Sequence, residues 1–338
     1  MPQGSRNLSA KRSSPRRVAS AAARPSLSFT IHPLPPFRLD LTVWALRRRP
    51  ENILDRWDGH VYRRVLLLDG KTGALTAEVA VEQTGSVARP CLSVTARVPH
   101  ATRELHHYLR ATLERMLGAA SDLRGFYSFA ASQKPLRELI ADFTGLKPPR
   151  YPTIFEALLN AISCQQVSLN VGIMLLNRLV QSFGRSAPAT PSANAGAPAR
   201  ACPSPADLAN LSTGSLRALG YSRNKERAIL DLSRTVASGE LNLESFRELD
   251  DATALESFTA IRGIGRWSAE YALLRGMGRL NIFPGDDVGG WNNLQKHLRL
   301  RVRPDYAKTR KLLAPWKNYA GLIYFHFLLD GLRSRGLL

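Results

Sequence analysis

The chain of 338 residues has few cysteines, few acidic residues and no long apolar run. Its three cysteines, Cys91, Cys164 and Cys202, are scattered and form no CxxC pair, which argues against a disulfide framework and leaves no evident zinc or iron–sulfur site. The sequence therefore predicts a reducing, intracellular setting and no cofactor. No apolar stretch is long enough to span a membrane, so no membrane partner is expected.

The shortage of acidic residues gives the chain a strong positive charge. There are 47 Lys and Arg residues against 27 Asp and Glu, and the formal net charge is +20. Such a charge does not decide the fold, but it favours a polyanionic partner. A solvated basic surface that meets an acidic protein partner remains the alternative at this stage.

The first segment, residues 1–28, consists mainly of Ser, Arg, Ala and Pro, and the first acidic residue of the chain is Asp40. The segment cannot bury enough apolar surface to fold alone, which predicts a disordered basic tail. Three other interpretations stay open: a misassigned start, non-specific contacts with phosphates, and an organelle transit peptide.

Residues 29–118 predict a small α+β domain. Strand patterns cover three stretches, Tyr62–Leu68, Ala74–Val81 and Leu92–Val98. Residues Asp69–Gly73 join the first two as a hairpin signal, and Thr102–Leu117 has the apolar spacing of an amphipathic helix. The alternation in Leu39–Val43 predicts a further strand, and Pro50–Trp57 predicts a short helix.

Residues 119–338 predict a mostly helical domain. Helical patterns cover Lys134–Phe143, Thr153–Ser163, Asn224–Ser238, Tyr306–Trp316 and Tyr319–Leu332. The Ala/Pro/Ser-rich residues 186–205 predict a flexible insert between helices. The predicted fold class is therefore α+β, with a small N-terminal antiparallel sheet-plus-helix domain followed by a mostly α domain of two helical lobes with a cleft between them.

Residues 253–275 predict two helices joined by a tight turn, Arg262-Gly263-Ile264-Gly265. The two glycines let the backbone bend sharply and approach another molecule closely. The second helix begins directly after the turn, and the free N–H groups of a helix N-terminus suit a phosphate. A loop, Phe283–Asp287, then places two neighbouring carboxylates at the start of the next helix.

In this order, the pieces resemble the helix-hairpin-helix of DNA repair glycosylases, followed by their Gly/Pro-rich loop and its catalytic aspartate. The closest resemblance is to DNA-3-methyladenine glycosylase II, of the alkylation-repair branch. The matching pieces are GIGRWSA from Gly263 on, Tyr271, Leu274–Gly276, Phe283 and Asp286–Asp287. The resemblance extends from about Leu39 to the C-terminus and weakens in the N-terminal third. It implies a helical glycosylase domain with a sheet-bearing domain ahead of it.

The family's catalytic aspartate aligns with Asp287, the second of the pair. Release of a base from DNA breaks a C–N glycosidic bond through an oxocarbenium-like transition state. A nearby carboxylate stabilises that charge and orients or deprotonates a water. A helix N-terminus is expected to keep the carboxylate ionised. The alternative is that Asp286 and Asp287 only cap the helix.

The extruded base needs a pocket. Aromatic faces suit an electron-poor, cationic base, and the resemblance implies Trp267, Tyr271 and Phe325 as pocket residues, with core packing as the alternative. Related glycosylase/lyases hold a lysine at the position of Trp267, and its amine attacks the sugar. An indole cannot do so, which predicts a monofunctional enzyme that uses water and leaves an abasic site.

The resemblance also implies the residues that contact DNA. Gln166, in the loop between two helices, is expected to fill the gap left by the extruded nucleotide, with a simple polar turn as the alternative. The hairpin is expected to bind phosphate through Arg262, Gly263, Ile264, Gly265 and Arg266. No metal site is certain, although the family often holds a monovalent cation on hairpin carbonyls, here those of Ile261 and Ile264.

We therefore expect a monomeric base excision repair hydrolase that acts on double-stranded DNA containing a damaged base. The expected substrates are alkylated purines such as 3-methyladenine and 7-methylguanine. Two alternatives remain: a glycosylase for deaminated or oxidised bases, and a non-catalytic helix-hairpin-helix protein that binds DNA. The location follows the source, cytoplasmic at the nucleoid in a bacterium and nuclear otherwise.

Overall fold

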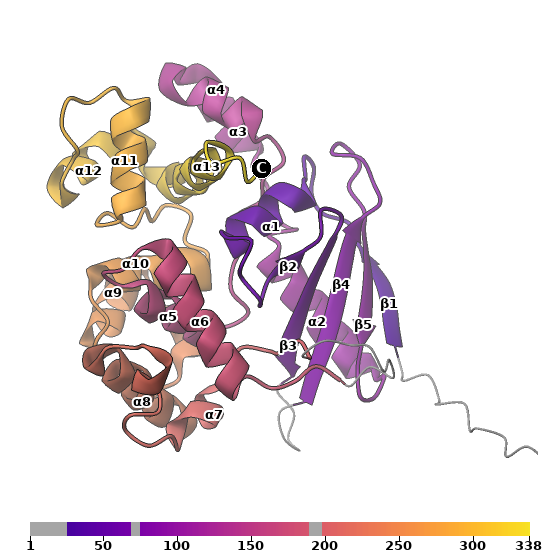
Figure 1. Cartoon of the computed structure of the whole chain (residues 1–338). Coiled ribbons are helices and arrows are strands. Elements are labelled where there is room, and N and C mark those ends of the chain that lie inside the picture. Colours follow the sequence, from indigo (N-terminus) through magenta and orange to yellow (C-terminus); the bar gives the residue numbers. More distant parts are fainter. Residues whose placement is uncertain (1–25, 69–74, 189–197) are drawn as a thin grey trace, which may run out of the picture.

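The computed structural model describes residues 26–68, 75–188 and 198–338, and it combines one antiparallel sheet with a larger helical part (Figure 1). The strands are β1 (Ser26–Ile31), β2 (Arg56–Trp57), β3 (Val61–Leu68), β4 (Leu75–Gln83) and β5 (Leu92–Arg97). All pairs are antiparallel, in the order β1-β5-β4-β3-β2. The predicted α+β class is confirmed. The predicted hairpin turn Asp69–Gly73 lies outside the described residues.

The helices predicted from residue 102 onward are present, with ends within a few residues of the prediction. The helices of the structure are α1 (Leu39–Arg47), α2 (Arg103–Met116), α3 (Arg124–Ser132), α4 (Lys134–Asp142), α5 (Ile154–Cys164), α6 (Leu169–Phe183), α7 (Pro205–Ala209), α8 (Arg223–Ala237), α9 (Asp251–Ala260), α10 (Arg266–Ala272), α11 (Val288–His297), α12 (Tyr306–Leu313) and α13 (Ala320–Arg333). A π-helical turn, η3 (Leu273–Met277), continues α10, and 3-10 turns form η1 (Arg217–Leu219), η2 (Leu243–Glu248) and η4 (Ala314–Tyr319).

Two separate cores divide the helical part into the two predicted lobes. One core gathers apolar side chains of α5 to α10, and the other gathers those of α3, α4 and α11 to α13. The two groups lie at the lower left and the top of Figure 1, with the sheet beside them. A third core joins the sheet to α2 and to the inner face of α5, through Ala157 and Ala161. Helix α5 therefore lies at the centre of the molecule.

The strand predicted for Leu39–Val43 is wrong, because these residues form helix α1. Leu39, Val43 and Leu46 point into the core of the sheet, whereas Leu41 and Ala45 point into the core around α13. A helix buried on opposite faces has no polar stripe, so its apolar residues alternate by coincidence. The short helix predicted for Pro50–Trp57 is also wrong, and its last two residues form β2.

Parts of the two segments predicted to lack structure belong to ordered elements of the fold. Strand β1 begins at Ser26, so the last three residues of the predicted tail belong to the sheet. At the predicted insert, Ser186 and Arg200 form a β-bridge and α7 begins at Pro205. The rest of the tail, residues 1–25, and residues 189–197 of the insert lie outside the described residues.

A buried ionic cluster fixes the sheet against α5. Arg64, on β3, pairs with Asp55 at 2.5 Å and with Glu156 on α5, and Arg64 and Asp55 are each about 1% exposed. Tyr62 donates a hydrogen bond of 2.8 Å to the same Asp55. A charge buried this deeply is stable only when it is paired. These ion pairs fix the position of the sheet relative to α5. Helix α5 carries Asn160 and leads into the loop at Gln165.

Candidate active site

The helix-hairpin-helix forms as predicted, from α9, the turn and α10. Ile264 is 4% exposed and packs into the hairpin core, and Gly263 has a φ of +82°. A Cβ at Gly263 would lie 2.4 Å from the Cβ of Ala228 on α8, so only glycine fits this turn. Gly265 is the N-cap of helix α10 and gives it no side-chain cap, which leaves backbone N–H groups there for an anion.

The loop between α5 and α6 lies against this hairpin. The side chain of Gln165 donates to the carbonyl of Gly263 at 2.9 Å and to the hydroxyl of Ser268 at 2.8 Å. Its neighbour Gln166 is exposed and has a φ of +52°, a strained conformation for a residue with a side chain. Gln166, the predicted gap-filling residue, therefore lies at the tip of a loop that Gln165 fixes to the hairpin. The sequence did not predict this role of Gln165.

Asp287 caps helix α11 and faces the hairpin. Its Oδ1 accepts a hydrogen bond from the N–H of Gly290 at 2.6 Å. Its Oδ2 accepts from the indole N–H of Trp267 at 3.1 Å and from the hydroxyl of Tyr324 at 3.3 Å. The cap predicted as an alternative is present, and it uses only one of the two oxygens. The other oxygen meets two aromatic side chains, Trp267, which was predicted to hold the base, and Tyr324, which was not.

Two opposing effects act on the charge of Asp287. Burial is the larger, and it raises the pKa of the Asp287 carboxyl. Hydrogen bonds from Gly290, Trp267 and Tyr324, and the charge of Arg48, lower this pKa but do not cancel the rise. The sequence predicts a carboxylate kept ionised by the helix N-terminus, and burial works against that effect.

The loop that carries Asp287 is fixed by hydrogen bonds to both backbone groups of Gly285. Its N–H donates to the Glu270 carboxylate at 2.7 Å, and its carbonyl accepts from the Trp291 indole at 2.6 Å. Glu270, on α10, is 3% exposed and also accepts from the Tyr306 hydroxyl at 2.9 Å. A Cβ at Gly285 would lie 2.5 Å from the Tyr306 ring. Glu270 therefore ties the loop to the helix that carries Trp267.

The three predicted pocket aromatics differ in their surroundings. Trp267 is partly exposed, and its ring lies 5.4 Å from that of Tyr271. Tyr271 is 2% exposed, and the guanidinium carbon of Arg275 lies 5.6 Å from its ring centroid. Phe325 is fully buried in the core around α13, with the same guanidinium 5.2 Å from its ring, and its place in the base pocket stays a prediction.

Three further residues belong to the site and were missed. Tyr324, next to Phe325 on α13, reaches Asp287, whereas Phe325 points into the core. Asn160, on α5, accepts from the Tyr271 hydroxyl at 3.0 Å and from Arg48 at 2.7 Å. Helical spacing marked the aromatic run on α13, but nothing in the local sequence marks Asn160 or Arg48.

The two arginines of the hairpin turn are exposed. Arg262 lies 3.6 Å from Asp231, and Arg266 lies 3.7 Å from Asp286. Ion pairs this long and exposed are weak, so neither carboxylate keeps its arginine from a phosphate, and the guanidinium of Arg266 also lies 4.1 Å from the centroid of the Tyr306 ring. The predicted cation site remains a prediction. At the hairpin, the carbonyl of Ile261 accepts the N–H of Ile264 at 3.0 Å.

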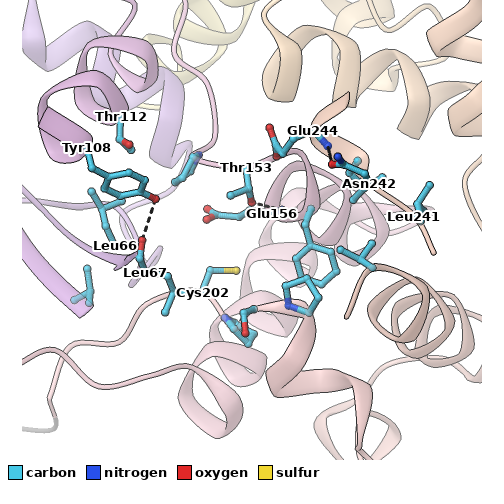
Figure 2. Close-up of a pocket in the computed structure, with 18 of the residues that line it drawn as sticks. Leu66, Leu67, Tyr108, Thr112, Thr153, Glu156, Cys202, Leu241, Asn242 and Glu244 are labelled. Atoms are coloured by element: carbon cyan, nitrogen blue, oxygen red, sulfur yellow. Dashed lines mark hydrogen bonds between the residues drawn. The ribbon is translucent and has the colours of Figure 1, made fainter. Parts of the chain in front are cut away.

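A cavity of about 460 Å³ lies elsewhere, between the sheet and α2 on one side and α5 and η2 on the other. Figure 2 shows Glu156 and Cys202 directed toward it, and Tyr108 donating to the carbonyl of Leu67 at 3.3 Å. Its lining includes none of the predicted site residues. The cavity is thus separate from the site around Asp287.

Comparisons with known proteins agree with this geometry. Residues 159–318 match the family model of the HhH-GPD superfamily base excision DNA repair protein. The DNA-3-methyladenine glycosylase of Bacillus subtilis is 28% identical over 206 residues, which cover 61% of this chain and 66% of that protein. DNA-3-methyladenine glycosylase 2 of Escherichia coli is 28% identical over 177 residues, which cover 52% of this chain and 58% of that protein.

Among solved structures, the 3-methyladenine DNA-glycosylase from Archaeoglobus fulgidus matches with a TM-score of 0.78 and 24% identity, over 92% of this chain and all of that chain. The chain spans 66% and 58% of the length of these two curated relatives, which is less than two thirds, and the whole of the solved structure. The hairpin, its glycines and the aspartate at the next helix all lie within residues 159–318, the part of the chain that matches the helix-hairpin-helix superfamily of base excision DNA repair proteins.

Proposed function

We propose that the chain is a monofunctional DNA glycosylase that removes alkylated purines, such as 3-methyladenine and 7-methylguanine, from double-stranded DNA. The observation that carries the proposal is the Asp287 carboxylate, with one oxygen held by the Trp267 indole and the Tyr324 hydroxyl beside the hairpin. A protein that only binds DNA gains nothing from a carboxylate buried close to its phosphate-binding turn, because that charge repels the backbone.

The proposed reaction begins when the damaged nucleotide leaves the duplex and Gln166 fills the gap. The C1′–N bond breaks, the electron pair leaves with the base, and positive charge develops on the sugar. Asp287 stabilises that charge. A water oxygen then bonds to C1′, the water proton passes to Asp287 or to solvent, and an abasic site remains. Hydrogen bonds from Trp267 and Tyr324 fix the carboxylate during these steps.

Water rather than a protein amine is the proposed nucleophile because Trp267 has no nucleophilic nitrogen. In the related lyases that the sequence resembles, a lysine at this position forms a Schiff base with the sugar. Reduction with borohydride during the reaction should therefore trap no covalent adduct between protein and DNA. A trapped adduct would contradict the monofunctional mechanism.

The curated relatives named for 3-methyladenine support alkylated purines as the substrate class. The test is release of bases from duplex DNA treated with a methylating agent, with alkali added afterwards to cleave abasic sites. We expect methylated purines to appear in the supernatant, and strand breaks after alkali only. Binding to the duplex without release of any methylated, deaminated or oxidised base would favour a non-catalytic protein.

A further inference from the structure

Arg48 is a buried cation that the proposed reaction does not use. It follows α1, is 5% exposed and adopts the left-handed conformation, with a φ of 61°. That conformation costs roughly 1–2 kcal/mol in a residue with a side chain. Burial of a guanidinium without a carboxylate is also unfavourable. Two such costs at one residue indicate a functional role rather than simple packing.

The hydrogen bonds of Arg48 leave most of its donors unused. Its Nη2 donates to the Asn160 side chain at 2.7 Å, and its guanidinium carbon lies 6.0 Å from the centroid of the Tyr271 ring. Its Nε is buried without an acceptor, and within the described segments Nη1 has none and no carboxylate forms an ion pair with the side chain. Arg48 thus brings N–H donors without an acceptor and a positive charge that no carboxylate of the described residues holds in an ion pair.

This charge lies beside the proposed base site. The Tyr271 ring lies near both the Arg48 guanidinium and the Trp267 ring, and the Trp267 indole donates a hydrogen bond to Asp287. The charge of Arg48 also acts on the ionisation of Asp287 and Tyr324. The N-terminal segment, which contains the sheet, therefore contributes one cation to a site otherwise built by the helical lobes.

We propose that Arg48 is a specificity-determining residue that favours uncharged modified bases with an exposed hydrogen-bond acceptor over bases that carry their own positive charge. The inference rests on the proposed glycosylase function. A ring nitrogen or carbonyl of an uncharged base can accept from the free N–H groups of Arg48. A methylated purine such as 7-methylguanine is cationic in DNA, and like charges repel strongly in a site shielded from water.

This proposal changes the role of the pocket aromatics. The sequence suggests that aromatic faces attract a cationic base, but Arg48 and Arg275 both lie near the ring of Tyr271. Their charges compete with a cationic base for the same ring. Release of a cationic base must therefore depend on its weak glycosidic bond rather than on favourable binding. Release of an uncharged base depends on binding contacts such as those of Arg48.

The test compares two substrates in otherwise identical duplexes, one containing 1,N6-ethenoadenine, which is uncharged, and one containing 7-methylguanine. Single-turnover rate constants give the ratio of uncharged to cationic base release for wild type, Arg48→Met and Arg48→Lys. We expect Arg48→Met to lower this ratio by on the order of tenfold. Arg48→Lys keeps the charge and a donor, and should retain most of the wild-type ratio.

The matched control is Arg49→Met, because Arg49 is adjacent and its guanidinium instead binds Asn170 on α6 at 2.5 Å. A change in overall DNA affinity affects both substrates equally and leaves the ratio unchanged. If Arg48→Met unfolds, Arg48→Gln removes the charge and keeps a neutral donor, and we expect it to lower the ratio as well, by less than Arg48→Met. Release of neither base by wild type would refute the glycosylase function, whereas release with a ratio unchanged in Arg48→Met and Arg48→Gln would refute only the role of Arg48.

Discussion

Replacement of Glu270 by alanine tests how the site holds its carboxylate. Glu270 lies on α10 and accepts two hydrogen bonds, from the N–H of Gly285 at 2.7 Å and from the hydroxyl of Tyr306 at 2.9 Å. Gly285 precedes Asp287 by two residues in the same loop. Loss of the Glu270 carboxylate should therefore release the loop from the helix that carries Trp267, without removing any group that touches the DNA.

The size of the effect follows from these two bonds. A hydrogen bond to a charged group contributes about 1.5–3 kcal/mol, and a buried donor left unpaired costs about 1–3 kcal/mol. If roughly 3 kcal/mol of this total is lost in the placement of Asp287, the rate falls about 100-fold, since about 1.4 kcal/mol corresponds to tenfold. We expect KM to change less than about threefold, because the hairpin turn is untouched.

The assay is base release from methylated duplex DNA under single-turnover and steady-state conditions. Glu270→Gln is the matched variant, because its amide oxygen still accepts the N–H of Gly285, and we expect it to recover activity to within about tenfold of wild type. Thermal unfolding of both variants checks that the fold is intact. A folded Glu270→Ala protein that keeps the wild-type kcat, or that loses activity only through KM, would refute the positioning role.

Two further predictions concern stability. Burial lowers the pKa of His326 to about 4, below its unfolded value of about 6.5, so the folded state favours neutral His326. The contribution of neutral His326 to the free energy of unfolding is complete above pH 6.5 and falls by about 3 kcal/mol as the pH drops to 4. Denaturation of His326→Leu at several pH values should not show this loss. An equal loss in the variant would contradict the assignment. Gly263→Ala forces a Cβ against Ala228 at a φ of +82° and should destabilise the fold by about 1–3 kcal/mol. Gly265→Ala meets no atom within 4 Å and should unfold at nearly the wild-type temperature; equal melting temperatures would refute the strain.

Local sequence predicted the parts of the site that are close together in the chain. The hairpin, Trp267 and Asp287 lie within 253–287, and turn chemistry and helix spacing determine how they meet. The placement of Asp287 at the start of α11 is observed. Its role in the reaction remains a prediction, which base release by variants of Glu270 and Asp287 tests.

Residues that meet through tertiary packing could not be predicted in this way. Arg48 and Asn160 are separated by 112 positions in the chain and meet only through tertiary packing, in which α1 lies against α13. On α13, consecutive residues differ in direction by about 100°. The aromatic pattern therefore marked the helix but did not decide that Tyr324, rather than Phe325, faces Asp287.

The central claim is that the Asp287 carboxylate drives base release, and Asp287→Asn tests it most directly. The amide keeps an oxygen for the N–H of Gly290, so the α11 cap and the fold should be retained. Asp286→Asn is the matched control, because Asp286 makes only a long contact with Arg266. On methylated duplex DNA we expect Asp287→Asn to bind with nearly wild-type affinity and to lose at least about 100-fold in single-turnover release, a loss of about 2.7 kcal/mol in transition-state stabilisation. Release by Asp287→Asn at the wild-type rate would contradict the claim.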